Sequence, residues 1–311
     1  MKCLVTGATG FIGRSLCQAL RARGAEVVAL SRSGGDVAAD VSSVACDLVG
    51  AEVGESLLAG VDTVFHLAGV AHQRAPATAY DALNYGATLR LARRAREFGV
   101  RCFVFLSSVK AMGPPTGIAA RAENDCSEPV GAYARSKQQA EQALLAEYTD
   151  SPMAVLIVRP ALVYGPGVKG NLRQLARAVQ RGLPRPPEGG RRSMIALADL
   201  VDLLCHVSLH APPGNHTWIA CGAGSYSTRD IYDLLRAALG RDKGSAWLPG
   251  PLWRLAAAGL DLVSLNKGES TYSKLFGAEV YANQRLVADT QWRPKVRLED
   301  SVQQLLAEMP A

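Results

Sequence analysis

Short apolar runs of strand length alternate with longer segments of helical period over the first half of the chain. In the first helical segment, Ile12, Leu16 and Leu20 recur every four residues, which places them on one buried face. Because strands and helices alternate, we expect an α/β fold with a doubly wound parallel sheet of the Rossmann type. The six predicted strands are Lys2–Thr6, Glu26–Ser31, Val44–Asp47, Thr63–Leu67, Cys102–Ser107 and Ala154–Arg159. The predicted helices are Phe11–Arg23, Ala77–Phe98 and Tyr133–Tyr148.

The regular alternation ends after Pro160, where turn-forming glycines and prolines gather at 165–167 and 184–190. We therefore predict a first domain over residues 1–165 and a smaller C-terminal region over 166–311. Part of about 193–225 is expected to return to the first domain. Elements predicted in the C-terminal region are helices near Leu172–Arg181, Asp199–Leu209 and Thr228–Leu239 and a strand at Ser193–Leu197, followed by a weakly patterned tail.

Composition excludes several classes of protein. Of the 311 residues 48% are hydrophobic and 20% are charged, which is typical of a globular chain with a sizeable core. The seven cysteines are an odd number without a CxxC pair, so we expect reduced, mostly buried thiols in a cytoplasmic protein. The apolar stretch Leu252–Leu265 is interrupted by Arg254 and Asp261 and is too short for a membrane span, which predicts a packed amphipathic helix and no integral membrane segment.

The net charge of +6 leaves nucleic acid, anionic membranes and acidic small molecules open as partners. One predicted helix carries a basic face, but no aromatic residues are interleaved with it. We expect that face to be solvated or to contact a partner helix, and we expect no binding of nucleic acid. The histidines lack ligand spacing, so no metal site is predicted. The basic face consists of Arg90, Arg93, Arg94 and Arg96.

Three glycines, Gly7, Gly10 and Gly13, lie between the first strand and the first helix. Such a turn needs a residue without Cβ, a second glycine lets the backbone approach a pyrophosphate, and a third lets the helix pack on the sheet. The helix start at Phe11 and Ile12 then offers free N–H groups to phosphates. A merely structural turn is the alternative, because glycine spacings of this kind also arise by chance. The strand before and the helix after favour a dinucleotide site.

The end of the second strand bears on the choice of dinucleotide. A carboxylate there holds the ribose of NAD, whereas an arginine accommodates the 2′-phosphate of NADP. The chain has Ser31 and Arg32 at this point, and Arg14 follows the third glycine. We therefore favour NADP over NAD as the cofactor, with two solvated surface arginines as the alternative interpretation.

A candidate catalytic set follows the fifth strand. Ser108 comes after that strand, and Tyr133 and Lys137 are four residues apart on one face of the next helix. A lysine ammonium near a phenol favours the phenolate, which moves the tyrosine pKa toward the range where it exchanges protons. The serine hydroxyl can hold the same substrate oxygen.

These residues make the chain resemble the extended short-chain dehydrogenase/reductase family, in particular nucleotide-sugar epimerases, dehydratases and reductases of the UDP-galactose 4-epimerase type. The resemblance covers nearly the whole chain. It rests on the motifs TGATGFIG at 6–13, Asp47-Leu48, HLAG at 66–69, Asn84, Ser107-Ser108, Tyr133 with Lys137, and RPALVYGPG at 159–167.

The resemblance implies roles for individual residues. Tyr133 would transfer the proton, Ser108 would assist it, and Lys137 would bind the nicotinamide ribose. Asp47 would meet the adenine. Further residues that it places beside the cofactor are Leu48, Leu67, Ala68, Gly69, Tyr133 and Pro160.

The chain departs from the family in two places. Dehydratases of the family follow the serine with an Asp-Glu pair, but Val109 and Lys110 follow Ser108 here, so a carboxylate-driven dehydration is not expected. The acidic residue that epimerases carry after strand two is also missing, which favours an enzyme that exchanges NADPH.

Residues 165–171 and 190–193 resemble reductases that act at C4 of UDP-2-acetamido-2,6-dideoxy-4-keto-hexoses for surface polysaccharide (O-antigen) precursors. That resemblance implies a UDP-sugar substrate, with Ser107, Ser108, Asn171 and Arg192 in contact with it and Arg192 near the diphosphate. A solvated basic pair is the alternative for Arg192. The alternative functions are a UDP-hexose 4-epimerase that retains NAD and a catalytically silent NAD(P)-binding sensor or scaffold. Relatives pair the helices at 77–98 and 133–148 between subunits, which implies a homodimer.

Overall fold

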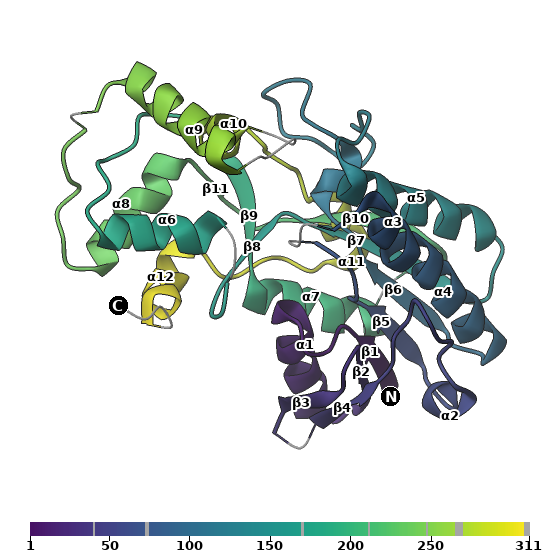
Figure 1. Cartoon of the computed structure of the whole chain (residues 1–311). Coiled ribbons are helices and arrows are strands. Elements are labelled where there is room, and N and C mark those ends of the chain that lie inside the picture. Colours follow the sequence, from purple (N-terminus) through teal and green to yellow (C-terminus); the bar gives the residue numbers. More distant parts are fainter. Residues whose placement is uncertain are drawn as a thin grey trace.

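The computed structural model describes residues 1–39, 41–71, 75–168, 171–210, 212–246, 248–264 and 270–307. Within these residues the largest sheet has the strand order β10-β7-β6-β5-β1-β2-β4-β3 and carries helices on both faces (Figure 1). The predicted α/β fold of Rossmann type is confirmed. The strands of this sheet are β1 (Lys2–Thr6), β2 (Glu26–Ser31), β3 (Gly35–Ala38), β4 (Val41–Ala45), β5 (Thr63–His66), β6 (Cys102–Leu106), β7 (Ala154–Pro160) and β10 (His216–Ala220).

The sheet differs from the prediction at both edges. Six parallel strands were predicted. Seven of the eight strands in the described sheet are parallel, the additional one being β10, which pairs in parallel with β7. At the other edge β3 is antiparallel to β4, and β4 itself begins three residues before the predicted strand. The prediction missed β3 because Gly35 and Asp36 are exposed and only Val37 is buried, so its apolar signal is weak.

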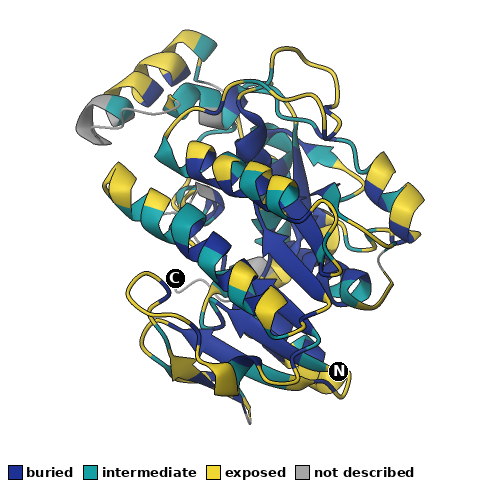
Figure 2. Cartoon of the chain, turned by 90° about the vertical axis from the view of Figure 1, so that its right-hand side faces the viewer, coloured by how far each residue is buried: buried dark blue, intermediate teal, exposed yellow. Residues whose placement is uncertain are grey.

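Helices cover both faces of the sheet. The helices α1 (Phe11–Ala22) and α7 (Leu197–His210) pack on one face, and α4 (Thr88–Glu97) and α5 (Ala132–Glu147) pack on the other. Phe103 and Phe105 of β6 belong to one core and Val104 to the opposite core, as the alternation of side chains along a strand requires. Figure 2 shows the buried strands between helices whose outer faces are exposed.

The helical run predicted over 77–98 contains a change of helix type. It begins as α3 (Ala77–Tyr80), continues as the π-helix η1 (Asp81–Ala87) and ends as α4. Asn84 lies in the π-helical part and is fully buried. Short π-helical segments are frequent at functional sites.

The C-terminal region is built around a second, small sheet with the strand order β11-β9-β8. Its apolar core includes side chains from β8 and β9 and from the helices α6, α8 and α12. Figure 1 places this region beside the large sheet. The division near residue 165 stays a prediction. The elements of the region are β8 (Leu162–Tyr164), α6 (Asn171–Gln180), β9 (Arg192–Ala196), β11 (Ser225–Tyr226), α8 (Thr228–Ala238), α9 (Gly250–Ser264), α10 (Thr271–Phe276), α11 (Gln284–Thr290) and α12 (Leu298–Ala307).

Among the described residues, the helices α9 to α12, from Gly250 onward, occupy the tail whose pattern was weak. The apolar stretch at Leu252–Leu265 overlaps α9, and within the described chain no helix is both long and apolar enough to cross a membrane. Five of the seven cysteines are buried, as predicted, whereas Cys46 is half-buried and Cys126 is exposed.

Candidate active site

The turn from β1 into α1 is shaped by glycines. Gly7 has a φ of 66°, and a Cβ there would lie 2.8 Å from the backbone nitrogen of Ala68. A Cβ at Gly13 would overlap the Gly7 carbonyl oxygen. Gly10 precedes α1 without a side-chain cap, and the first turn of the helix carries no acidic residue. The helix start therefore keeps backbone N–H groups for an anion, which fits the pyrophosphate of a dinucleotide.

Arg14 lies between this glycine turn and β3. Its guanidinium donates from Nε to the Thr9 carbonyl at 3.1 Å and from Nη1 to the carbonyls of Asp36 and Val37 at 2.9 and 3.0 Å. The Asp36 carboxylate accepts a hydrogen bond from the Ser42 hydroxyl. Three carbonyls thus orient Arg14, and no carboxylate neutralises its positive charge through these bonds.

The two residues at the end of β2 lie in different environments. Ser31 is buried and its hydroxyl shares a hydrogen bond of 2.8 Å with that of Ser43, while Arg32 is exposed. The structure therefore leaves the Arg32 charge in solvent and directs the Ser31 hydroxyl into the sheet.

The loop after β4 contains Asp47, the predicted adenine contact, and Leu48, which was predicted to lie beside the cofactor. Asp47 is exposed and its carboxylate accepts the backbone N–H of Val49, while Leu48 is buried. Arg90 of α4 donates to the carbonyls of Leu48 and Val49 at 2.8 and 3.1 Å. Arg90 was expected on a solvated or partner-binding face, but it holds this loop in place.

The rest of that basic helix face is also used within the chain. Arg93 forms a two-pronged ion pair with Glu147 of α5, and Arg94 pairs with Glu97. Since these guanidinium groups already have carboxylate partners, the face has less free positive charge than the sequence alone indicates.

A buried network joins the ends of β1 and β5. The His66 ring is hydrogen bonded to the Thr6 hydroxyl at 2.8 Å and to the Thr88 hydroxyl at 2.9 Å. Burial, with the nearby Lys137 charge, lowers the pKa of His66 to about 3, so the ring is neutral at physiological pH. The backbone N–H of Ala68 donates to Thr6 Oγ1, which fixes the course of Leu67, Ala68 and Gly69.

Asn84 secures the same loop from the helix side. Its side chain accepts from the Val70 backbone N–H at 2.8 Å and donates to the Val70 carbonyl at 3.1 Å. A Cβ on Gly69 would lie 3.0 Å from Asn84 Oδ1 and 3.4 Å from Lys137 Nζ. A side chain at position 69 would therefore press on the Asn84 amide oxygen, which would have to shift by a few tenths of an ångström.

Ser108, Tyr133 and Lys137 converge at the end of β6. The Ser108 hydroxyl forms a hydrogen bond with the Tyr133 phenol, which lowers the tyrosine pKa, but burial has the larger effect and raises it overall. The Lys137 ammonium donates to the Leu106 carbonyl at 2.9 Å and lies 4.4 Å from the centre of the Phe105 ring. Burial lowers the Lys137 pKa to about 8, while Glu141 opposes that shift.

This differs from the expected effect of the lysine on the tyrosine. Burial raises the Tyr133 pKa above its ordinary value, so the expected lowering by the lysine does not prevail. The Lys137 ammonium is turned toward the Leu106 carbonyl instead. Its position next to Gly69 suits a contact with a ligand lying over that loop.

A buried ion pair behind this set was missed from the sequence. Arg159 at the end of β7 binds Glu141 of α5 through Nε and Nη2, the shortest contact being 2.6 Å. The Ser107 hydroxyl donates to the same carboxylate, and Ser107 is buried. Glu141 lies four residues after Lys137, one turn further on the same helix face, which is the signal that could have found it.

The predicted substrate contacts in the C-terminal region lie on β9 and α6. Asn171 begins α6, and its side chain lies outside the described part of the chain. Arg192 begins β9 and donates to the carbonyls of Gly277 and Ser273 at 3.2 and 2.5 Å. It therefore anchors the end of α10 in addition to any contact with a ligand. Pro160 ends β7, opposite Ala220 of β10.

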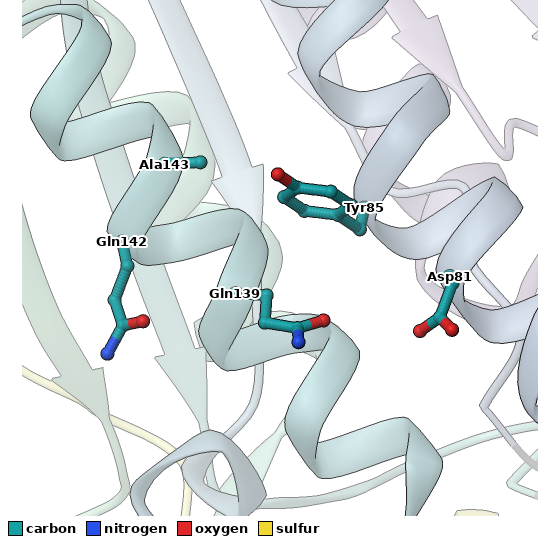
Figure 3. Close-up of a pocket in the computed structure, with 5 residues that line it drawn as sticks. All are labelled: Asp81, Tyr85, Gln139, Gln142 and Ala143. Carbon is teal, nitrogen blue, oxygen red and sulfur yellow. The ribbon is translucent and has the colours of Figure 1, made fainter.

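A separate hollow lies between η1 and α5. Figure 3 shows Tyr85 directed from η1 toward α5, and Gln139 directed from α5 toward the side of Asp81. Gln139, Gln142 and Asp81 are exposed, so this hollow lies on the outer surface of the two helices. Among the described residues no group of three metal-ligating side chains is found. The hollow is lined by Asp81, Tyr85, Gln139, Gln142 and Ala143.

The fold and the site define a dinucleotide-binding enzyme with a serine, a tyrosine and a lysine at the sheet edge. A model of the NAD dependent epimerase/dehydratase family matches residues 3–220, and the chain belongs to this family. The predicted family resemblance and the prediction of an NAD(P)-dependent enzyme are confirmed.

Known proteins agree with this assignment. The chain is 34% identical to a UDP-glucose 4-epimerase of Vibrio cholerae over 266 residues, which is 80% of this chain and 79% of that protein. It is 31% identical to a 2-alkyl-3-oxoalkanoate reductase of Stenotrophomonas maltophilia, covering 58% of this chain and 57% of that one. A structure of MoeE5 with UDP-glucuronic acid and NAD has a TM-score of 0.79 at 24% identity, covering 99% of this chain and 98% of the other, and shows the shared fold.

Proposed function

We propose that this protein is an NADPH-dependent reductase acting at C4 of a UDP-2-acetamido-2,6-dideoxy-4-keto-hexose. It would supply a precursor of surface polysaccharide such as O-antigen, in the cytoplasm. The observation that carries the proposal is the placement of Arg14, whose guanidinium is oriented by the Thr9 carbonyl of the glycine turn and by two carbonyls of β3, the strand that follows β2 in the chain. A fixed cation there favours the 2′-phosphate of NADP, a cofactor that is exchanged in each turnover rather than retained.

The protonation state of Tyr133 supports reduction. Burial raises the Tyr133 pKa above its ordinary value of 10, so the phenol carries its proton at neutral pH. A ketone that gains a hydride develops negative charge on oxygen and needs a proton donor. A protonated Tyr133 would supply the proton that this step needs.

The proposed step divides the work between three side chains. When bound, NADPH supplies the hydride that reduces the C4 carbonyl. Tyr133 gives its phenolic proton to the C4 oxygen, and Ser108 donates a hydrogen bond to the same oxygen. Lys137 holds the nicotinamide ribose and is held in turn by the Leu106 carbonyl. Val109 and Lys110, which follow Ser108, offer no carboxylate for an elimination.

The decisive experiment follows NADPH oxidation by the purified protein against a panel of UDP-4-keto sugars and UDP-hexoses, with product stereochemistry read by NMR. We expect turnover of the 4-keto sugars with NADPH. Tyr133→Phe should lower kcat by about 100- to 10,000-fold while the Kd for NADPH stays within twofold. If Tyr133→Phe retained turnover, Tyr133 could not be the proton donor.

A UDP-hexose 4-epimerase is the second candidate function. It is favoured by the relative of that name in Vibrio cholerae, which is 34% identical. The same three side chains would serve it, with Tyr133 first accepting a proton. An epimerase of this kind would be purified with stoichiometric NAD and would interconvert UDP-hexoses with no cofactor added, and a reductase would do neither.

We further infer a homodimer formed through the outer faces of η1, α4 and α5. The support is the resemblance to relatives that pair these helices, together with the surface hollow between η1 and α5. Light scattering should then give about twice the chain mass of 32.9 kDa. A chain-mass particle at micromolar concentration would exclude this interface.

A further inference from the structure

Lys110 links the turn that carries Ser108 to a distant part of the chain. It lies on the short helix η2 (Val109–Met112), and its backbone N–H donates to Ser108 Oγ at 3.2 Å. Its ammonium contacts the Glu279 carboxylate, with Nζ 2.6 Å from Oε1. The two residues are 169 positions apart, so this ion pair joins the serine turn (residues 107–112) to the C-terminal region.

Glu279 belongs to a segment, residues 279–282, that lies beside β9. The Glu279 backbone N–H donates to the Arg191 carbonyl, and the Ser193 N–H donates to the Glu279 carbonyl, each at 2.9 Å. These bonds form a β-bridge between Glu279 and Arg192. The partner of Lys110 is therefore fixed next to the arginine that is expected to meet the substrate diphosphate.

A second, rigid connection runs through Arg121. Its backbone pairs with Val280 and Ala282, while its guanidinium donates to the carbonyls of Met112 and Gly113 at 2.7 Å each. Arg121 is buried. The frame between the serine turn and segment 279–282 is thus set by buried bonds, and the Lys110–Glu279 pair is a partly exposed side-chain link within it, with 41% and 14% of the two side chains exposed.

We propose that Lys110 is a positioning residue that, through Glu279, couples the orientation of the Ser108 hydroxyl to the substrate-holding segment beside Arg192. This inference rests on the proposed function in one respect, namely that the substrate is a nucleotide-diphosphate sugar held near Arg192. Ser108 Oγ accepts the Lys110 N–H, so its own proton is directed to another acceptor. Loss of the ion pair removes the side-chain restraint on Lys110, whose N–H helps to set the direction of that proton, while the Arg121 bonds to Met112 and Gly113 remain.

The first arm of the test is kinetic. Lys110→Met and Glu279→Gln should each lower kcat about tenfold, because a small misplacement of a hydrogen-bond donor is costly in the transition state. The Kd for NADPH should stay within twofold. Lys110→Arg should recover at least half of the wild-type kcat, and the double variant Lys110→Met/Glu279→Gln should be no slower than either single variant.

A matched control is offered by the Arg23–Asp202 ion pair. It spans 179 positions at 2.7 Å, and 43% and 37% of its side chains are exposed, but it lies between α1 and α7. Arg23→Met should leave kcat within twofold of wild type. The proposal is overturned if Lys110→Met lowers kcat no more than Arg23→Met does, or if the effects of the two single variants multiply in the double variant.

The second arm needs no substrate. Amide hydrogen exchange over residues 108–112 and 279–282 should be at least tenfold faster in Lys110→Met than in wild type and in Arg23→Met. Unchanged exchange in both segments contradicts the link. If the wild-type protein turns over no sugar of the panel, the proposed function fails, and the exchange measurement still decides whether Lys110 holds the serine turn.

Discussion

The Arg159 guanidinium and the Glu141 carboxylate form a buried ion pair directly behind the serine turn, with a shortest contact of 2.6 Å. The same carboxylate accepts the Ser107 hydroxyl, and Arg159 also donates to the Glu123 carbonyl at 2.9 Å. Removing one member of such a pair leaves the other charge buried without a partner.

Arg159→Met should therefore destabilise the protein strongly. We expect the free energy of unfolding to fall by about 3–5 kcal/mol, because Glu141 keeps its burial and loses its counter-charge. Urea denaturation measures this free energy of unfolding. The control is Arg101→Met, which removes an exposed ion pair with Asp62 and should cost about 0–1 kcal/mol. Equal losses in the two variants would contradict the importance assigned to the buried pair.

Gly13→Ala should impair the turn between β1 and α1. The added Cβ would overlap the Gly7 carbonyl oxygen, so α1 must move away from the sheet edge. We expect a fall in the free energy of unfolding of about 1–3 kcal/mol and a weaker Kd for NADPH. Calorimetry gives both quantities. In the control Gly117→Ala an added Cβ meets no atom within 4 Å, so neither the free energy of unfolding nor the Kd for NADPH should change. A Gly13→Ala variant with wild-type values of both would contradict close packing at this turn.

Arg14→Met should change the preference between cofactors. Loss of a charge-assisted hydrogen bond of about 1.5–3 kcal/mol raises the Kd for NADPH by roughly 10- to 150-fold and leaves that for NADH nearly unchanged. Fluorescence titration with both nucleotides measures the ratio. Arg21→Met, in the last turn of α1, serves as the control. A parallel loss for both nucleotides would mean that Arg14 acts by holding β3 rather than by contacting a phosphate.

The free energy of unfolding should depend on pH through the titration of His66. Burial lowers its folded-state pKa from 6.5 to about 3, so between these values the unfolded chain binds a proton that the folded chain does not. The free energy of unfolding then falls as the pH drops through this window, by about 1.4 kcal/mol per pH unit from this residue. In His66→Gln this contribution should vanish. Denaturation curves at pH 6.5 and 5 compare the two proteins, and equal slopes would exclude His66 as the source.

The sequence pattern predicted the parts of the fold that depend on local periodicity and on spacing. Alternating apolar runs gave the sheet type, and the four-residue spacing of Tyr133 and Lys137 gave a pair that the structure brings together with Ser108. The spacing places Glu141 one turn after Lys137, but it could not show that Glu141 meets Arg159, because a buried ion pair is defined by two elements that meet only in the folded chain. Lys110 and Glu279, 169 positions apart, were hidden for the same reason.

At the cofactor end of the site, prediction from the sequence failed for a different reason. Arg14 and Arg32 were both expected near a phosphate, yet Arg14 is held by two carbonyls of β3 while Arg32 is exposed. The two positive charges could be read from the sequence. Which of the two arginines is held in place depends on the β3–β4 hairpin, whose carbonyls bind Arg14. That hairpin has too few buried side chains to be predicted from periodicity.

The position of β10 in the sequence, far behind its partner strand β7, affects folding during synthesis of the chain. It pairs with β7 through residues 216–220, whereas β7 itself ends at Pro160. During translation the sheet therefore has an open edge at β7 until residue 220 has left the ribosome, and the buried Leu156 and Val158 lie on that edge. A fragment that stops at residue 165 would keep the edge open permanently and is expected to aggregate, so the nucleotide-binding half cannot be prepared by simple truncation.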